Sequence, residues 1–395
     1  MTCAPGDGRP RPVRPAPRKL SVAGSTLPGM TISSAQALAW RLDRQHLRAG
    51  AASAVDVVRR LGAVPAWSGD AELAVRRRLA DPVPGAVAAA LAAGDLVRTF
   101  AFRGSSHLMA ADEAGVFLRI RTASRQWALR SWQEHYDLRP EDWPPLLDAV
   151  RDALAGGPLT REELADAVTA VPRFAHLGPA LLHPSMTLLK PIAWHGELCF
   201  APSRDGRPVL ASPAASPRWQ GLPDLDDAGR RAVAGYLGAY GPATRANLRY
   251  WLADGLSAGR RRVETWTDEV LADAAAEVAV DGEPALVLRD HVAGLEAAEP
   301  ADAVTLLAGH DQWVLGPGTA DTRVVPAALR PVVTRGAALV LHGGVVAGTW
   351  TTTGGTLDVA WSAGAGAVPE RALADEAARL AGLLGRDLDV RVAVA

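Results

Sequence analysis

Apolar residues recur every three or four positions from Thr31 onward, which is the period of an amphipathic helix. The stretch SSAQALAWRLDRQHL opens with serines that can cap a helix, and AVDVVRRLG ends at Gly62, a residue typical of helix ends. The same pattern continues through AELAVRRRLA and PGAVAAALAAG as far as Gly94. We therefore predict a run of helices between Thr31 and Gly94.

The hydrophobic period then changes from helical spacing to strict alternation. DLVRTFAF and SSHLMA alternate apolar and polar residues on either side of Arg103-Gly104, which predicts two strands joined by a tight turn. Helices followed by a two-stranded hairpin describe a winged helix, a helix-turn-helix with a β wing.

The same order of elements returns twice. EDWPPLLDAVRDALAGG, LTREELADAV and MTLLKPIAWHG are predicted helices, the second with Thr160 and Glu163 in a capping pattern. ELCFAPS and RPVLAS then form a predicted hairpin around residues 204–206. The third round comprises DDAGRRAVAGYLGAYG, TRANLRYWLADG and RRRVETWTDEV, followed by AEVAV and PALVLR on either side of Asp281-Gly282. The repeat is one of architecture, because no close sequence repeat accompanies it.

After about residue 300 the pattern becomes mainly that of strands. AVTLLAG, VVPA, ALVLHGG, VVAGTW and TLDVAW are short apolar runs between Gly-rich turns, and PERALADEAARLAGLLG is a helix before a last strand, DVRVAVA. We predict an α+β fold of three tandem winged-helix units with a small C-terminal β-barrel. The predicted divisions are a disordered, basic, Pro-rich tail at 1–28, winged helices at 29–135, 136–222 and 223–299, and the C-terminal domain at 300–395.

Composition narrows the class of protein only slightly. The chain has 395 residues, 48% of them hydrophobic, and a net charge of -1, so it can bury several cores but has no global charge that indicates a nucleic-acid partner. The chain has only two cysteines, Cys3 and Cys199, so we expect no disulfide framework. No apolar run reaches the ~18–20 residues of a membrane span and the N-terminus has no signal-peptide core, so a cytoplasmic protein without membrane contact is expected.

A local basic patch is the first candidate for function. Arg260, Arg261 and Arg262 are consecutive and cannot all face a core, so contact with phosphate is favoured over a plain solvated run. Arg103, at the tip of the first hairpin, suits a phosphate or minor-groove contact.

Several stretches together resemble the winged-helix family of YcaQ/AlkZ-type DNA glycosylases. They are ALAWRLDRQHL, RRLGAVPAW, LVRTFAFRGSSHLM, YLGAYGPAT, WVLGPGTADTRVVP and VVAGTW. The resemblance extends over nearly all of the chain from Met30. It implies tandem winged helices around a C-terminal β-barrel, removal of alkylated bases, and unhooking of interstrand crosslinks.

The sequence differs from the family at the motif that carries out the family's chemistry. The family carries Gln-apolar-Gln after the second helix, and its amides position a hydrolytic water. This chain has Pro65-Ala66-Trp67 at the aligned position, and neither Pro nor Trp supplies such an amide. The family's catalytic residues therefore cannot be transferred to this chain.

Two carboxylates just beyond Trp67 are the candidate catalytic groups. Asp70 or Glu72 could stabilise an oxocarbenium-like sugar and orient a water, while Trp67 could stack on a lesion. Each residue also has a structural alternative. Asp70 could cap the next helix, Glu72 could be a solvated first-turn charge, and Trp67 could be a core anchor between helices.

Histidines supply the remaining candidates. His107, on the returning strand of the first hairpin, could contact DNA or could be a buried, hydrogen-bonded histidine. His310 and Asp311 could form a general-base pair, but we favour a structural role in which they hold the C-terminal domain to the first.

Three functions remain open from the sequence. The favoured one is a cofactor-free, monofunctional DNA glycosylase that acts on bulky or alkylated purines in duplex DNA, and self-resistance to a DNA-alkylating natural product is a setting that the resemblance implies. The alternatives are a non-catalytic lesion-binding protein, which the lost glutamines favour, and a protein-interaction module. We expect a monomer. We also expect no metal site, because no Cys-x-x-Cys pair or His-rich spacing is present.

Overall fold

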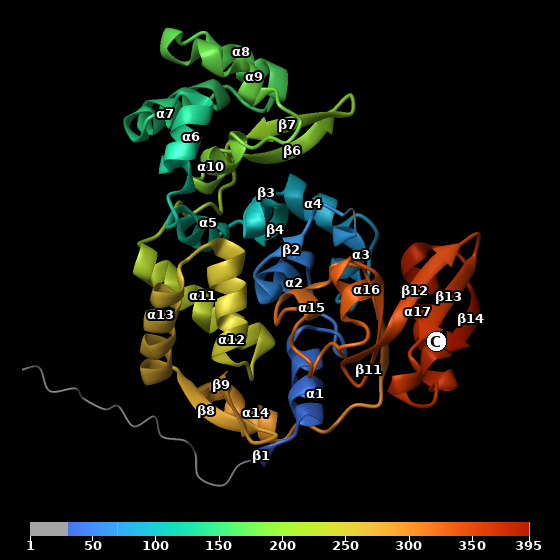
Figure 1. Ribbon diagram of the computed structural model, residues 1–395. Helices are drawn as coiled ribbons and strands as arrows, with labels where there is room; N and C mark the ends of the chain where they lie inside the picture. The colour runs from blue at the N-terminus through green and yellow to red at the C-terminus, as the bar shows by residue number, and fades with distance from the viewer. Residues whose placement is uncertain (1–30, 69, 395) are drawn as a thin grey trace, which may run out of the picture.

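The computed structural model describes residues 31–68 and 70–394, so the predicted tail at 1–28 lies outside the described residues (Figure 1). The helices of the first part form where the periodicity predicts them, and β3 and β4 form the first hairpin. Their bounds are α1 Ser34–Arg44, α2 Ala54–Leu61, β2 Val64–Pro65, α3 Ala71–Arg76, α4 Ala86–Ala92, β3 Leu96–Phe100 and β4 Ser106–Ala110. Two further helices, α5 Ala114–Thr122 and α6 Arg130–Tyr136, were not predicted.

The second and third hairpins also form at the predicted turns. The middle part of the chain contains α7 Trp143–Leu154, β5 Leu159–Thr160, α8 Arg161–Thr169, α9 Gly178–Leu181, α10 Leu189–Trp194, β6 Cys199–Arg204 and β7 Arg207–Ala211. The predicted capping box of α8 is confirmed, because the Thr160 hydroxyl accepts from the Glu163 amide and the Glu163 carboxylate accepts from the Thr160 amide. The next part contains α11 Leu225–Tyr240, α12 Arg245–Leu248, a π-helical turn Arg249–Asp254, α13 Arg260–Asp273, β8 Ala275–Val280, β9 Glu283–Leu288 and α14 Val292–Glu296.

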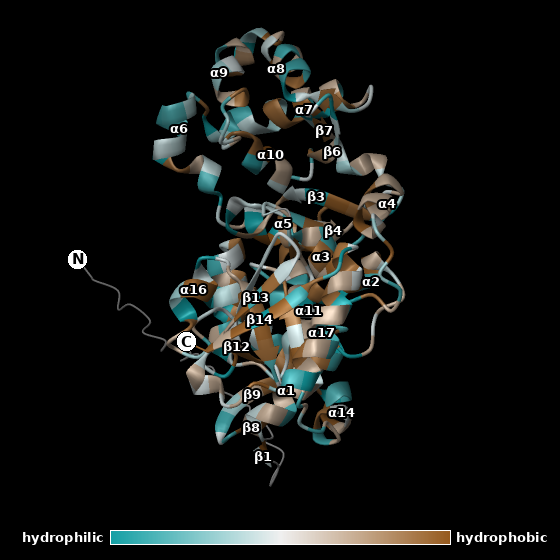
Figure 2. Cartoon of the chain, turned by 90° about the vertical axis from the view of Figure 1, so that its right-hand side faces the viewer, coloured by the Kyte–Doolittle hydropathy of each residue, from teal (hydrophilic) through white to brown (hydrophobic). Residues whose placement is uncertain are grey.

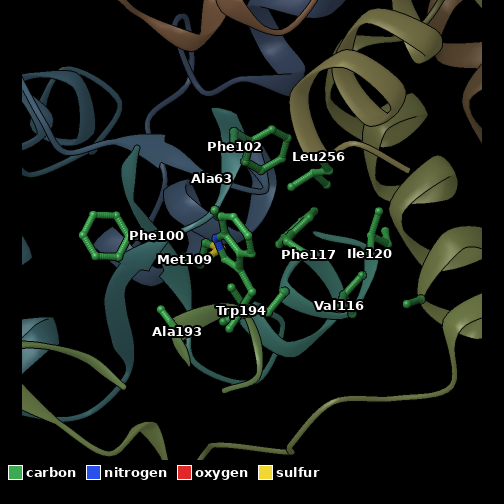
Figure 3. Packing of buried hydrophobic residues seen from close by; sticks show 14 of the residues in the cluster. Ala63, Phe100, Phe102, Met109, Val116, Phe117, Ile120, Ala193, Trp194 and Leu256 are labelled. Atoms are coloured by element: carbon green, nitrogen blue, oxygen red, sulfur yellow. The ribbon is translucent and has the colours of Figure 1, made fainter. Parts of the chain in front are cut away.

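The first two hairpins share one sheet. β3 pairs with β6 at Arg98 and Phe200, which joins the strands in the order β2-β4-β3-β6-β7-β5. The third hairpin is separate, and β1 (Thr31–Ile32) pairs with β8 in parallel. One hydrophobic cluster runs through all three parts, with Met109, Phe117, Trp194 and Leu256 among its members (Figure 3). The predicted divisions at 135 and 222 therefore cross a shared core, and they stay predictions.

The C-terminal part is an open sheet in the described residues, so the predicted small β-barrel is wrong. Its elements are β10 Val304–Leu307, α15 Gln312–Leu315, α16 Arg330–Thr334, β11 Ala338–His342, β12 Val345–Thr353, β13 Thr356–Trp361, α17 Glu370–Leu384 and β14 Asp389–Val394. The strand order β10-β11-β12-β13-β14 leaves β10 and β14 at opposite edges. The predicted strand VVPA is also wrong, because Val324 and Val325 lie buried in a turn.

Helices on both faces explain why the sheet stays open. Leu38 and Leu42 of α1 pack with Trp313 against one face, and Leu373 and Leu380 of α17 pack against the other. A sheet with both faces covered has no need to close on itself to bury its apolar side chains. Figure 2 shows that hydrophilic residues cover the outside of α8, at the end of the molecule opposite β1. The described residues contain no helix long and apolar enough to cross a membrane.

A buried ion pair joins the C-terminal part to the first. Arg78 follows α3, and its Nη1 and Nη2 atoms donate to the Asp311 carboxylate at 2.8 and 2.7 Å. Both side chains have 0% exposure. Asp311 also accepts from the Trp313 amide at 2.7 Å, so it begins α15 and fixes the loop before it. The favoured structural role of Asp311 is therefore confirmed.

We predict that Asp311→Asn lowers the free energy of unfolding by about 3–5 kcal/mol, because it leaves the Arg78 charge buried without a counterion. Asp43→Asn is the matched control, since its partner Arg48 is 46% exposed and such pairs contribute about 1 kcal/mol or less. Urea denaturation measures both. Equal losses in the two variants would contradict a dominant role for the buried pair.

Candidate active site

A short edge strand carries the chain to the candidate site. Val64 and Pro65 pair with Leu108 and His107 of β4, and the Ala66 amide donates to the Ser106 carbonyl at 3.0 Å. A proline is tolerated here because β2 lies at the edge of the sheet, where its missing N–H leaves no ladder bond unmade. The pairing fixes where Trp67 emerges, directly after the strand.

Trp67 is not a core anchor, because its side chain is 44% exposed. The space between α2 and α3 is filled by small aliphatic residues instead, such as Val57, Val58 and Val75. The indole ring lies between two imidazoles, with ring centroids 5.1 Å from His107 and 5.6 Å from His310. The structure thus brings together three of the residues that the sequence singled out.

These rings form part of the wall of a cavity of about 240 Å³. Phe102, Tyr250 and Trp251 line it beside Trp67 and His107. Phe102 packs against Trp251 at a centroid distance of 4.8 Å. Flat aromatic faces in this arrangement suit a planar aromatic guest such as a nucleobase.

Arg103 adds a positive charge to the cavity. Its guanidinium lies 4.6 Å above the Tyr250 ring and it remains exposed at the hairpin tip, as predicted. The backbone there has φ 52° at Arg103, a left-handed conformation that turns the side chain over Tyr250. Arg103 can therefore contact an anionic group at the mouth of the cavity while it stacks on the ring.

His107 is buried and hydrogen-bonded, which confirms the structural alternative for its environment. Its Nδ1 lies 3.0 Å from the Ser105 carbonyl oxygen, and a carbonyl only accepts, so Nδ1 carries the proton. Burial lowers the pKa of His107 to about 4. The ring is neutral near pH 7 and leaves Nε2 as an acceptor.

Asp70 does not line the aromatic cavity but lines a second and much smaller void. This void of about 10 Å³ is lined by Ser68, Asp70 and His310, among others, and its size matches about one water molecule. Burial raises the pKa of Asp70, and the nearby His310 opposes that shift. Within the described residues the Asp70 side chain makes no hydrogen bond to the start of α3, so the capping alternative is wrong.

Glu72 has a different partner. Its carboxylate accepts from the amides of Gly85 and Val87 at 2.8 and 3.2 Å, at the N-terminus of α4. It therefore satisfies backbone donors of another helix and interacts favourably with that helix dipole. Glu72 lines neither the aromatic cavity nor the water-sized void.

His310 connects the two spaces, because it lines both of them. It adopts φ 56°, and its imidazole lies against Gly336, where an added Cβ would be 2.1 Å from Cε1. Any side chain at position 336 would displace the ring. The carboxylate of Asp311 is bound to Arg78, so the less favoured alternative, a His310–Asp311 general-base pair, does not form.

The three consecutive arginines are exposed at the start of α13, as their sequence predicted. Among the described residues, no carboxylate forms an ion pair with Arg260, Arg261 or Arg262. Cations at a helix N-terminus face the positive end of its dipole, which disfavours them unless an anion binds nearby. Gly255, which lines the aromatic cavity, lies only a few residues earlier.

Sequence reasoning missed the aromatic residues of the opposite wall. Tyr250 and Trp251 fall within the predicted helix TRANLRYWLADG, and Phe102 falls within the predicted strand DLVRTFAF. Only the packing of the first and third parts brings them together, and no local pattern marks them. A π-helical turn at Arg249–Asp254 is the local irregularity that presents Tyr250 to the cavity, and such turns are frequent at functional sites.

Comparison with known proteins decides the family. A family model described as DNA glycosylase AlkZ-like matches residues 58–383. The chain belongs to this AlkZ-like DNA glycosylase family.

A curated relative and a solved structure agree with the AlkZ-like assignment. The relative, an interstrand DNA cross-link repair glycosylase of Streptomyces sahachiroi, is 35% identical over 361 residues, which cover 89% of this chain and 96% of that protein. The solved structure of Streptomyces sahachiroi DNA glycosylase AlkZ matches with a TM-score of 0.87 and 34% identity, over 92% of this chain and all of the other. The mixed α+β fold is thus the fold of an AlkZ-like glycosylase.

We predict that His107 makes the free energy of unfolding decrease as the pH is lowered. Its folded pKa of about 4 lies below the usual 6.5, so the unfolded chain binds the proton more readily. The free energy of unfolding should therefore decrease as pH falls from about 6.5 to about 4. His107→Gln should flatten this decrease by roughly 1–3 kcal/mol. Urea unfolding at several pH values measures it, and an unchanged slope in the variant would contradict the assignment.

Proposed function

We propose that this AlkZ-like protein hydrolyses the N-glycosidic bond of alkylated purines in duplex DNA, including N7-alkylguanine in crosslinks. One observation carries the proposal: His310 forms a wall shared by the aromatic cavity and by the water-sized void that contains Asp70. A base site and a water site thus lie side by side, which is the arrangement that hydrolysis at a sugar carbon needs.

The name of the curated relative supports the substrate class. It describes repair of interstrand DNA crosslinks, and the similarity extends over nearly all of that protein. An N7-alkylguanine is cationic and leaves as a neutral base, so the chemical demand on the enzyme is modest. Self-resistance to a DNA-alkylating natural product is the biological setting that we propose for such an activity.

In the proposed reaction the base leaves with the electron pair of the glycosidic bond. The cavity formed by Trp67, Phe102 and Tyr250 holds the displaced base or adduct by stacking. A water beside Asp70 attacks the anomeric carbon, and the Asp70 carboxylate stabilises the developing positive charge and receives the water's proton. A pKa raised by burial suits Asp70 to accept this proton.

This scheme compensates for the lost glutamines. Pro65 and Ala66 pair with β4 through their backbone and have no polar side chain, so Ser68, Asp70 and His310 are among the residues that supply polar groups to the void instead. Asp70 is preferred over Glu72 because the Glu72 carboxylate is already bound to the amides of α4.

A second candidate function is lesion binding without catalysis. Replacement of the family's Gln-apolar-Gln by Pro65-Ala66-Trp67 favours it, since a stacking tryptophan can hold a lesion without any water-positioning group. The two candidates share the aromatic cavity and the basic residues. A measurement of base release from alkylated DNA distinguishes the glycosylase from the non-catalytic lesion-binding protein.

We predict that Asp70→Asn lowers base release from DNA carrying N7-alkylguanine by roughly 10²-fold or more, the scale of a lost general base. DNA affinity should stay nearly unchanged, because Asp70 does not line the aromatic cavity. Glu72→Gln is the control. It should keep turnover and lose about 1 kcal/mol of stability through its weakened cap.

Trp67→Ala should lower both lesion binding and turnover, since base stacking contributes about 1–3 kcal/mol. Single-turnover base release and fluorescence anisotropy measure the two quantities, with circular dichroism to check that each variant is folded. A wild-type protein that binds alkylated duplex tightly but releases no base would establish the non-catalytic function. Full activity in Asp70→Asn would move the catalytic group to His310 or His107.

Phosphate contacts generate a separate prediction. Replacing Arg260, Arg261 and Arg262 with Gln should weaken duplex binding for all sequences. It should also reduce the slope of log affinity against log salt by about one unit per lost phosphate contact. Arg130→Gln is a matched control, because that residue is 90% exposed and already paired with Glu134. An unchanged salt slope in the triple variant would show that the arginines do not contact DNA.

A further inference from the structure

A second group of basic side chains lies away from the aromatic cavity. It occupies an open groove of about 760 Å³ between α2, α11 and the turn before α14. His46, Arg60 and His291 line this groove, and Arg44 reaches it at Gly238. We call these four residues the basic cluster. Among the described residues, the groove and the aromatic cavity have no lining residue in common.

The two arginines of the cluster are held side by side. Arg44 Nε and Arg60 Nη1 both donate to the carbonyl oxygen of Gly238, at 3.1 and 3.4 Å. Position 238 has no side chain, and an added Cβ would lie 3.6 Å from Arg60 Nη1. The shared acceptor uses one N–H of each guanidinium, so the other N–H groups of each fork remain for a ligand.

The described part of the chain places no acidic group against this pair of arginines. Within residues 31–68 and 70–394, no carboxylate lies within 4.0 Å of Arg44 or Arg60. The carboxylates in the same groove already have partners, since Asp56 pairs with Arg59 at 3.6 Å and Glu113 pairs with Arg231 at 3.6 Å.

Two histidines flank the arginines, and their protonation responds to the arginine charges. Burial lowers the pKa of His46 and of His291, and the charges of Arg44 and Arg60 lower both further. The same repulsion acts between Arg60 and Arg44. Trp40 packs against the cluster, because its ring contacts the His291 ring and stacks against the Arg44 guanidinium. Such a set of like charges is unfavourable until an anion enters it.

We propose that this groove is a second binding site, and that its ligand is a phosphate group held by the free N–H groups of Arg44 and Arg60. Guanidinium forks match the geometry of phosphate oxygens and bind them through paired, charge-assisted hydrogen bonds. His46 and His291 flank the phosphate and donate to it as they take up protons. The phosphate can belong to the DNA backbone or to a free phosphate compound, and the groove recognises the chemistry that both share.

The first test uses inorganic phosphate as the probe. At constant ionic strength, with chloride as the reference, phosphate should raise the melting temperature of the wild-type protein, because a ligand that binds only the folded state stabilises it. Arg44→Gln/Arg60→Gln should weaken phosphate binding by about tenfold or more for each guanidinium removed. Arg59→Gln is the matched control, since Arg59 lines the same groove but is paired with Asp56 and Asp112.

A second variant distinguishes loss of the phosphate site from a folding defect. Arg44→Lys/Arg60→Lys keeps both charges and should retain phosphate binding with lower affinity, while circular dichroism checks the fold of each protein. Equal stabilisation of the wild type and the Gln variant by phosphate would overturn the site. So would the absence of stabilisation in the wild type together with unchanged duplex affinity in the Gln variant.

The second arm identifies the source of the phosphate. A lower affinity of the Gln variant for unmodified duplex DNA would assign the groove to the DNA backbone. Unchanged duplex affinity, with phosphate stabilisation lost only in the variant, would assign it to a free phosphate compound. Neither result depends on base release, so the groove can be tested even if the protein proves to be a non-catalytic lesion binder.

Discussion

The ion pair between Arg78 and Asp311 is the constraint on which the candidate site depends. It is fully buried, and it joins the end of α3 to the start of α15, two elements far apart in the sequence. Asp311 has His310 on one side and Gln312 on the other, and Gln312 Nε2 donates to the Ala63 carbonyl at 2.5 Å. The pair therefore sets the position of His310 against Trp67, and with it the wall between the aromatic cavity and the water-sized void.

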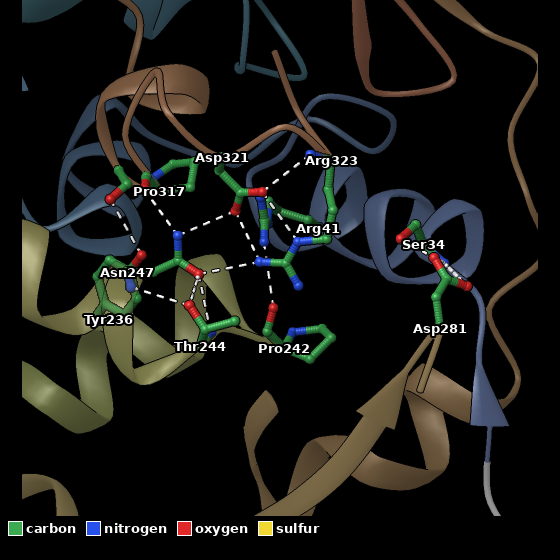
Figure 4. A network of polar contacts seen from close by, with 11 residues as sticks. Ser34, Arg41, Tyr236, Pro242, Thr244, Asn247, Asp281, Pro317, Asp321 and Arg323 are labelled. Atoms are coloured by element: carbon green, nitrogen blue, oxygen red, sulfur yellow. Dashed lines mark hydrogen bonds and ion pairs between the residues drawn. The ribbon is translucent and has the colours of Figure 1, made fainter. Parts of the chain in front are cut away.

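A second polar network fixes the opposite wall. Asn247 of α12 donates to the Pro317 carbonyl and to Asp321 at 2.9 and 3.1 Å, and Arg323 binds both Asp321 and Asn247 (Figure 4). The stretch GPGTADTR, which carried part of the family resemblance, thus anchors the helix that leads to Tyr250. Its role is to hold the third part of the chain in place, because Asp321 and Arg323 are committed to each other.

Local patterns predicted the elements well, and they predicted contacts between distant elements poorly. Periodicity, the Thr160–Glu163 capping box and the turn at Asp281-Gly282 depend on neighbouring residues, so one sequence contains the whole signal. Whether a sheet closes depends on what covers its faces, and α1 comes from the other end of the chain. The same limit applies to Asp70 and Glu72. Both looked equivalent in sequence, but the amides of Gly85 and Val87 bind only Glu72.

The structure explains why the chain tolerates replacement of the family's Gln-apolar-Gln motif by Pro65-Ala66-Trp67. The segment 64–66 is held by backbone pairing with β4, so its side chains can change without loss of the strand, and even a proline fits at this sheet edge. The imidazole of His310 comes from the C-terminal part, where the Arg78–Asp311 pair holds its backbone and Gly336 leaves room for its ring. An AlkZ-like scaffold can therefore lose both amides and still keep polar groups beside a base-sized cavity. In the proposed reaction this arrangement is what allows a carboxylate to take over the water-positioning role.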